Sequence, residues 1–321
     1  MSSRKRPLFL SMTIAIKRTL LAALLCSFVP AAPAAKATGK KTAVSLSPHL
    51  TELVYAAGAG DHLLGVAQGS NYPPAVSALP QVGSGVTPNV ERIAILQPDV
   101  ILAWGYKNSN NLYPALRKLD IPVHYQAPAS LDGIIEDIEE LGALFATQTA
   151  ASATARELRQ ILRTTRQRYQ NAAKIKTFVL VSQEPLYTLG AGSFVIDALH
   201  ACGAESVFET LSAPAPIVSR EQLLLAHPQA VLFAAKNTGR ESDILVRYFA
   251  SMGLRLQADQ LLGRDPDIVF RPADRLIRAL PGLCSDIDRI RRRLVPAASG
   301  SPLPPPPHLP SRSPRKDAAG A

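Results

Sequence analysis

The stretch TQTAASATARELRQILRTTRQRYQNAAK, residues 147–174, contains neither proline nor glycine and is rich in helix-forming residues. It predicts one continuous helix, which at 1.5 Å per residue would extend ~42 Å. Four arginines at spacings of three and four lie along one face of this helix: Arg156, Arg159, Arg163 and Arg166. A basic face can bind anions or membranes, although it is more often simply solvated. We expect a stiff strut between two lobes.

Short apolar runs rich in β-branched residues alternate with helical segments on both sides of this helix. Such alternation is typical of βαβ units and parallel sheets. The predicted strands are Ala43–Leu46, Leu63–Val66, Val100–Trp104, Val123–Gln126, Thr177–Ser182, Ala230–Ala234 and a weaker one at Leu254–Gln257.

The helical segments complete the predicted architecture. They are Leu50–Ala57, Val90–Leu96, Leu112–Leu119 and Leu131–Phe145. We therefore predict an α/β fold with two Rossmann-like lobes, residues 36–146 and 175–295, each built on a parallel sheet. The long helix over residues 147–174 joins them.

The N-terminal end of the chain has the pattern of a secretory signal peptide. Lys17 and Arg18 precede the apolar run Leu20–Val29, and small residues follow it. The run is too short to cross a bilayer, which takes ~20 apolar residues. We predict a signal peptide over residues 1–35, which starts at the first methionine or at Met12, and export of the mature chain.

The net charge of +10 lies mostly at the two ends of the chain. Residues 1–35 carry +5 and residues 296–321 carry +2, so the body carries only +3. Because a nucleic-acid-binding domain concentrates its charge on the folded body, we predict no nucleic-acid partner. Residues 296–321 also hold eight prolines and predict a disordered tail.

Removal of the signal peptide would leave two cysteines, Cys202 and Cys284. An even pair in an oxidising compartment most often forms a disulfide. Closing a loop of about 80 residues would stabilise the fold by roughly 4–5 kcal/mol in the chain-entropy model. Two free buried thiols are the alternative.

The chain has no G-x-S-x-G elbow, no G-x-x-x-x-G-K-[ST] phosphate loop and no H-E-x-x-H pair. Gly190-Ala-Gly192 is only a fragment of a glycine-rich loop and predicts a turn. No ligand-like spacing relates the histidines His49, His62, His124, His200, His227 and His308. We therefore predict no catalytic residue, no cofactor and no metal site.

Several short motifs, in a fixed order along residues 42–292, carry a family resemblance. They are Leu46-SPHLTELVYAA-Gly58, Asn71-Tyr-Pro-Pro74, Asn89-Val-Glu-Arg-Ile93, Gln97-PDVILA-Trp104, Leu199-His-Ala-Cys-Gly203, Val218-Ser-Arg-Glu-Gln222 and Asp267 through Arg275. Together they resemble the periplasmic cobalamin-binding proteins of vitamin B12 ABC importers, within the helical-backbone (class III) substrate-binding proteins. The Asn-Tyr-Pro-Pro and Pro-Asp-Val-Ile motifs alone occur widely in relatives that carry siderophores and haem.

The resemblance implies a role in ligand binding for five residues. Tyr72 matches an aromatic residue that lines the corrin pocket, and Trp104 ends a strand where the family also has a tryptophan. Tyr187 falls where the family has an aromatic facing the ligand. Asp267 and Arg271 match polar residues over the corrin face. Aromatic stacking with a few polar contacts suits a flat macrocycle. The alternatives are core packing for Tyr72 and Trp104 and a surface ion pair for Asp267 and Arg271.

Four further residues take roles from the resemblance. Cys202 and Cys284 match the family disulfide. Glu91 and Glu221, one in each lobe, match acidic residues that dock onto basic pockets of the dimeric permease. Solvated helix ends, favoured by the helix dipole, are the alternative for both glutamates.

Two positions depart from the family pattern. The family has a tryptophan in each lobe that packs against the ligand, whereas this chain has Gly85 and Ala215 there. Either the affinity is weaker, or the ligand is another corrinoid or haem, or neighbours such as Val86 and Ile217 compensate.

The resemblance and the residues together predict a binding protein rather than an enzyme. We expect a periplasmic monomer that captures cobalamin or a related corrinoid in a cleft between the lobes and delivers it to the permease dimer of an ABC importer. A haem or ferric-siderophore carrier of the same fold is the alternative. A chelatase-like enzyme is a remote one, because it would need clustered His, Glu and Asp.

Overall fold

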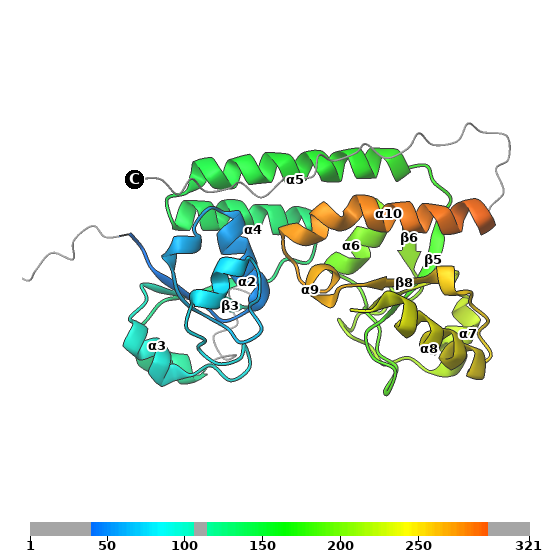
Figure 1. Cartoon of the computed structure of the whole chain (residues 1–321), viewed down its shortest axis with the longest axis horizontal. Coiled ribbons are helices and arrows are strands. Elements are labelled where there is room, and N and C mark those ends of the chain that lie inside the picture. The colour runs from blue at the N-terminus through cyan, green and yellow to red at the C-terminus, as the bar shows by residue number, and fades with distance from the viewer. Residues whose placement is uncertain (1–39, 106–113, 295–321) are drawn as a thin grey trace, which may run out of the picture. The chain divides into compact units, whose positions relative to one another are not determined.

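The computed structural model describes residues 40–105 and 114–294 (Figure 1). The predicted signal peptide and the predicted tail lie outside these residues.

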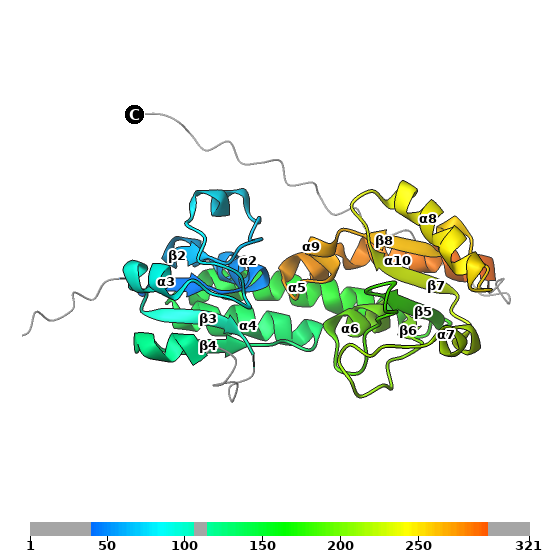
Figure 2. The same ribbon diagram turned by 90° about the horizontal axis from the view of Figure 1, so that it is seen from below.

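Each lobe is built on a parallel four-stranded sheet. The N-terminal sheet has the order β2-β1-β3-β4, and the C-terminal sheet has the order β6-β5-β7-β8. The strands are β1 (Ala43–Ser45), β2 (Leu63–Val66), β3 (Val100–Trp104), β4 (Val123–Gln126), β5 (Ile175–Leu180), β6 (Ala204–Ser206), β7 (Ala230–Ala234) and β8 (Leu261–Arg264). Figure 2 shows both sheets from below. The predicted fold class, two α/β lobes with parallel sheets joined by a long helix, is confirmed.

The prediction was wrong at one edge of the C-terminal sheet. Leu254–Gln257 is not a strand, and β8 pairs with β7 through Leu261–Arg264 instead. The alternation that suggested a strand arises because Leu254 and Leu256 belong to a loop and bury their side chains in the core beside β7. Strand β6 was missed because its three residues include no β-branched side chain.

Helices cover the sheets of both lobes. They are α2 (Pro48–Ala56), α3 (Val90–Leu96), α4 (Leu131–Leu144), α5 (Gln148–Tyr169), α6 (Phe194–Ala201), α7 (Arg220–Ala226), α8 (Thr238–Ser251), α9 (Pro266–Val269) and α10 (Asp274–Leu294), with short 3-10 helices at Gly60–His62, Pro74–Ala78, Pro114–Leu119 and Ala258–Gln260. The described part of the predicted helix 112–119 is thus a 3-10 helix. It ends where Asp120 takes a positive φ of 52° and Ile121 precedes a proline.

Helix α5 is the predicted connecting helix, but it is shorter than residues 147–174. It ends at Tyr169, because residues 170–174 turn the chain toward β5. Its arginine face is partly neutralised by neighbouring helices. Arg159 donates two hydrogen bonds to Glu139 of α4, at 2.7 and 2.6 Å, and Arg166 pairs with Asp132 at 2.7 Å.

One hydrophobic core runs through both lobes. It includes Leu102 of the N-terminal sheet, Leu158 and Leu162 of α5, and Leu232 of the C-terminal sheet. Helix α5 packs against α4, α6 and α10, so it belongs to the folded body (Figure 1). A bend in α5 would break backbone hydrogen bonds and open this core, so the helix resists hinge motion between the lobes. None of the helices in the described residues is both long enough and apolar enough to span a membrane.

Candidate functional site

Trp104 stands at the carboxyl end of β3, the edge of a parallel sheet where ligands of α/β proteins usually bind. It is the single tryptophan of the chain, and 42% of its surface is exposed, so it is not a core residue. The ring of His49 packs against it edge to face, with the ring centroids 4.5 Å apart.

His49 supports Trp104 from inside the N-terminal lobe. Burial, together with the positive charge of Arg271, lowers the pKa of His49 to about 3, so the imidazole is neutral at neutral pH. Its Nδ1 lies 2.6 Å from Oγ of Ser47, the residue before α2. The neutral, buried ring of His49 therefore holds the indole of Trp104, and part of the indole faces solvent.

Tyr72 lies in the loop that follows β2 and is 41% exposed. The guanidinium of Arg275, near the start of α10, sits over its ring at 4.3 Å from the centroid. Core packing, the alternative for Tyr72, is therefore wrong. The ring is held by a cation from the opposite lobe.

A group of charged and polar residues joins the two lobes beside Tyr72. We call it the Glu52 cluster, and it consists of Glu52, Asn71, Asp267, Arg271 and Arg275. Glu52, on α2, is 2% exposed. It accepts one hydrogen bond from Arg271 at 2.9 Å and two from Arg275 at 2.8 and 2.6 Å. The two lobes are thus tied by a buried carboxylate between two guanidinium groups.

The remaining contacts of the Glu52 cluster engage both predicted polar site residues. Arg271 donates to Asp267 at 2.6 Å, to Asn71 at 2.8 Å and to the carbonyl oxygen of Gly69 at 3.1 Å. Asn71 in turn donates to Asp267 at 2.7 Å. Asp267 and Arg271 therefore form more than a surface ion pair, since they belong to the contact between the lobes.

Sequence reasoning missed Glu52, Asn71 and Arg275 as members of this cluster. The available signal was Glu52 itself, a charged residue between the apolar residues of α2 that line the core. A carboxylate at such a position needs a buried partner, because an unpaired buried charge is strongly unfavourable.

The C-terminal lobe presents a second, largely apolar surface. Tyr187 forms antiparallel β-bridges with Ser182 and Ile217, and Ile217 is 59% exposed. A pocket of about 260 Å³ lies nearby at the carboxyl ends of β5 and β7. Its lining includes Val181, Phe233 and Ile244. The structure thus places Tyr187 and Ile217 side by side.

Gly85 and Ala215, the two departures from the family pattern, differ in their surroundings. A Cβ atom at Gly85 would lie 2.7 Å from the carbonyl oxygen of Leu46, the residue after β1, so this loop packs against the backbone there in a way that only glycine permits. Ala215 is exposed in the loop before Ile217. A tryptophan would fit at residue 215 but not at residue 85 without a backbone shift.

Glu91 and Glu221 occupy equivalent places in the two lobes. Each is the second residue of its helix, α3 or α7, and each is exposed. The side chains of Asn89 and Ser219 cap the two helices through hydrogen bonds of 2.9 and 3.1 Å. Hydrogen bonds from its own backbone and from Ser219 lower the pKa of Glu221, so its carboxylate is anionic at neutral pH.

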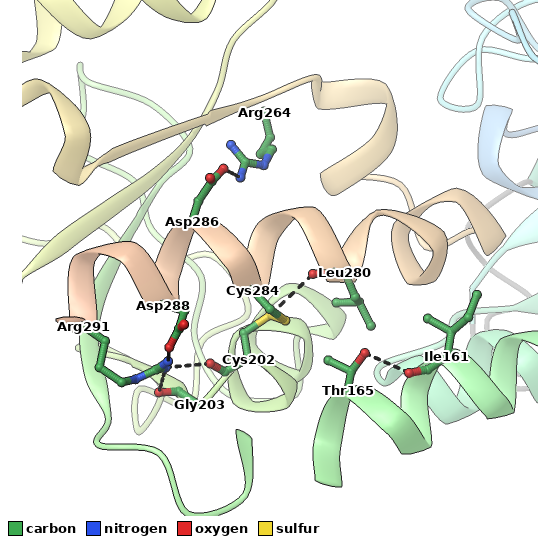
Figure 3. Close-up of a disulfide and its surroundings, with 10 residues drawn as sticks. All are labelled: Ile161, Thr165, Cys202, Gly203, Arg264, Leu280, Cys284, Asp286, Asp288 and Arg291. Atoms are coloured by element: carbon green, nitrogen blue, oxygen red, sulfur yellow. Dashed lines mark hydrogen bonds and ion pairs between the residues drawn. A yellow bond between two sulfur atoms is a disulfide. The ribbon is translucent and has the colours of Figure 1, made fainter. Parts of the chain in front are cut away.

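A disulfide joins Cys202, at the end of α6, to Cys284 in α10 (Figure 3). Both half-cystines are buried. Beside them Arg291 donates to the carbonyl oxygens of Cys202 and Gly203, at 2.8 and 3.0 Å, and is paired with Asp288 at 2.6 Å (Figure 3). The end of α6 is thus tied to α10 covalently and by hydrogen bonds.

We expect the denatured mature chain, without reductant, to contain no titratable thiol. Reduction should lower the free energy of unfolding by roughly 4–5 kcal/mol, because the 82-residue separation closes a long loop in the unfolded chain. Thiol titration in denaturant and urea unfolding with and without reductant measure the two quantities. Two free thiols in the oxidised sample would contradict the pairing.

Within residues 40–105 and 114–294, no group of three or more His, Cys, Asp or Glu side chains could hold a metal ion. Gly190 serves the packing of a loop, since a Cβ there would lie 2.1 Å from the carbonyl oxygen of Ala213. The predicted aromatic residues fall into three separate groups: Tyr72 beside the Glu52 cluster, Trp104 against His49, and Tyr187 beside Ile217.

Two α/β lobes, each built on a parallel sheet and joined by one long helix, are typical of a class of two-lobed ligand-binding proteins. Residues 44–252 match the model of the periplasmic binding protein family, and the chain belongs to this family. It is therefore a binding protein rather than an enzyme.

Curated relatives and solved structures agree with this assignment. The vitamin B12-binding protein of Vibrio cholerae is 31% identical over 264 residues, which cover 82% of this chain and 95% of the relative. That of Yersinia pestis is 33% identical over 247 residues, 77% of this chain and 86% of the relative. The crystal structure of the periplasmic vitamin B12-binding protein BtuF of Vibrio cholerae superimposes with a TM-score of 0.69 at 30% identity, over 78% of this chain and 98% of that one.

A haem-binding protein shares the fold as well. The periplasmic protein BhuT, solved with two haems, superimposes with a TM-score of 0.67 at 15% identity, over 79% of this chain and all of that one. This likeness concerns the fold alone.

Proposed function

We propose that the mature chain captures cobalamin or a related corrinoid between its lobes in the periplasm and delivers it to the permease dimer of an ABC importer. The observation that carries this proposal is the 31% identity to a vitamin B12-binding protein along 95% of that protein's length. In this proposal residues 1–35 are a cleaved signal peptide, residues 36–146 and 175–295 are the ligand-binding lobes, and residues 296–321 are a tail.

The surfaces described above suit a flat macrocycle. Trp104 and Tyr72 offer partly exposed aromatic rings from the N-terminal lobe, and Tyr187 and Ile217 offer apolar surface from the C-terminal lobe. Asp267 and Arg271 would supply polar contacts at the edge of the ligand. Because both already bond to other members of the Glu52 cluster, they are held in place before a ligand arrives.

Fluorescence of Trp104 tests the proposal, because no other tryptophan contributes to the signal. We expect cyanocobalamin to quench it with a saturable dependence on concentration, and equilibrium dialysis to retain the vitamin at a stoichiometry of one. A Trp104→Phe variant should lose the signal yet still retain vitamin in dialysis. Failure of the wild-type chain to retain cyanocobalamin or cobinamide would contradict the proposal.

A haem or ferric-siderophore carrier is the second candidate, and the observation that favours it is the loss of both family tryptophans at Gly85 and Ala215. Absorbance spectra of the purified chain after mixing with cyanocobalamin, cobinamide or haemin and gel filtration distinguish the two. Retention of haemin alone would favour the second candidate.

A tryptophan should have different effects on ligand affinity and stability at residues 85 and 215. Ala215→Trp should tighten cyanocobalamin binding about tenfold, because an exposed loop position gains a large aromatic surface for the ligand. Gly85→Trp should instead lower the melting temperature, because its Cβ would collide with the carbonyl oxygen of Leu46. Calorimetric titration and thermal unfolding of both variants measure these effects. Normal stability together with tighter binding in Gly85→Trp would contradict this interpretation.

A further inference from the structure

We propose that Ile95 and Leu225 are apolar anchors for the permease, and that each inserts into an apolar recess beside the basic pocket that receives the glutamate of the same lobe. The inference rests on the proposed function and adds two partner-binding residues to it. It begins from a repeat in the structure that links the two lobes.

The segments Asn89–Trp104 and Ser219–Ala234 repeat the same structure, residue for residue, at an offset of 130 positions. Each begins with a capping residue and continues with a seven-residue helix whose second residue is glutamate. Each helix ends at a residue in the left-handed region, with φ of 47° at Gln97 and 48° at His227. A proline follows, and a five-residue strand, β3 or β7, completes each segment.

Ile95 and Leu225 are equivalent in this repeat and are left out of the core in the same way. Their side chains are 80% and 78% exposed, whereas the equivalent residues Ile93 and Leu223, two positions earlier, are buried. Single exposed apolar residues are common on protein surfaces and need no explanation. Here a large apolar side chain is exposed twice, at matching positions of two helices whose sequences are identical only at the glutamate.

The position of each apolar side chain relative to the glutamate points to a shared partner. Ile95 follows Glu91 by four residues, and Leu225 follows Glu221 by four, so each pair lies on one helix face about one turn apart. An apolar side chain buried at an interface favours binding in proportion to the area removed from water, and by excluding water it strengthens an ion pair beside it. Helices α3 and α7 each lie on the side of their sheet away from α5 (Figure 1).

The repeated patch favours a partner with twofold symmetry. Two like patches, each an anion beside an apolar residue, fit a partner that presents two like recesses with basic rims, as a symmetric dimer does. A second copy of this chain fits less well, because carboxylates would then face carboxylates. The permease dimer of the proposed importer has the required symmetry.

Binding of the ligand-loaded chain to its importer, reconstituted in lipid nanodiscs, tests the inference. Ile95→Ser and Leu225→Ser should each weaken binding roughly tenfold and by similar factors, and the double variant roughly a hundredfold. Leu294→Ser, which removes an exposed apolar side chain at the end of α10, should leave importer binding unchanged. The Ile95→Met/Leu225→Met variant should bind like the wild-type chain, because it keeps two apolar side chains. Cyanocobalamin affinity in solution should be the same for all variants.

Each other outcome overturns the inference in a recognisable way. If the double serine variant binds the importer as tightly as the wild-type chain, the anchors are wrong although the proposed function stands. If only one of the two residues matters, the equivalence of the patches is wrong. If sedimentation shows a wild-type dimer that the serine variants dissociate, a second copy of this chain is the occupant. If the wild-type chain binds neither a corrinoid nor the importer, the proposed function is wrong, and the inference falls with it.

Discussion

The Glu52→Gln variant should lose about 3–5 kcal/mol of unfolding free energy, the cost of removing one partner from a buried ion pair. Glu52 is 2% exposed and receives three hydrogen bonds from Arg271 and Arg275. Without its charge, two guanidinium groups stay largely buried with too little negative charge around them. The melting temperature should fall by roughly 10 °C in a chain of this size. Urea unfolding and differential scanning calorimetry measure the two quantities.

An exposed ion pair between helices provides the control. Glu139→Gln removes a carboxylate that also accepts two hydrogen bonds from one arginine, Arg159, but both side chains are more than one third exposed. Such pairs contribute about 0–1 kcal/mol. Equal losses in the Glu52 and Glu139 variants would mean that the Glu52 cluster does not hold the lobes together.

The Glu52 cluster also shows where sequence reasoning stops. Asp267 and Arg271 could be proposed as site residues because they are close in sequence and match a family motif. Glu52 precedes Arg271 by 219 positions, and only the tertiary fold brings the two together. A buried glutamate between apolar residues signals that a cation is near, but many arginines in this chain could provide it.

Some strands could likewise be predicted from the sequence and others could not. Strands β3 and β7 could be predicted to the residue because each lies in a run of five or six apolar residues that polar residues soon follow. Strand β6 has only three residues, Ala204–Ser206, and exists because it pairs with β5. In the same lobe Leu254 and Leu256 alternate as in a strand, but they lie in a loop and bury their side chains in the core beside β7. Short edge elements depend on pairing partners that a local pattern does not reveal.

Gly85 gives a third example, from the proposed ligand-binding surfaces. The family resemblance predicts a tryptophan there, and the sequence has glycine. The structure adds that the backbone of Leu46 occupies the space into which a side chain would project. A tryptophan at residue 85 would therefore need a different path of the loop.

Reversing the charges of Glu91 and Glu221, the residues proposed to dock, should nearly abolish delivery to the proposed importer while ligand binding stays intact. Glu91 and Glu221 are exposed and lie on helices that carry none of the residues proposed to contact the ligand. A single exposed ion pair contributes only about 0–1 kcal/mol. Two pairs on lobes joined through a shared core gain from effective concentration, because binding at one lobe holds the other near its site. Each reversal also replaces attraction by repulsion, so one should weaken importer binding about tenfold, and both should leave almost none.

Uptake of radiolabelled cyanocobalamin by proteoliposomes, with Glu91→Lys, Glu221→Lys or the double variant supplied in excess, measures this loss. The Glu136→Lys/Asp243→Lys variant changes the net charge by the same amount at two exposed positions on α4 and α8, and it should support uptake like the wild-type chain. Wild-type uptake with the double docking variant would show that these glutamates are merely solvated helix ends. Equal loss in the control would show that the importer senses the overall charge of the chain, and weaker vitamin binding in solution would place Glu91 and Glu221 at the ligand. Loss confined to the docking variants, with unchanged vitamin affinity, is the result that two charged contacts held at a fixed separation require.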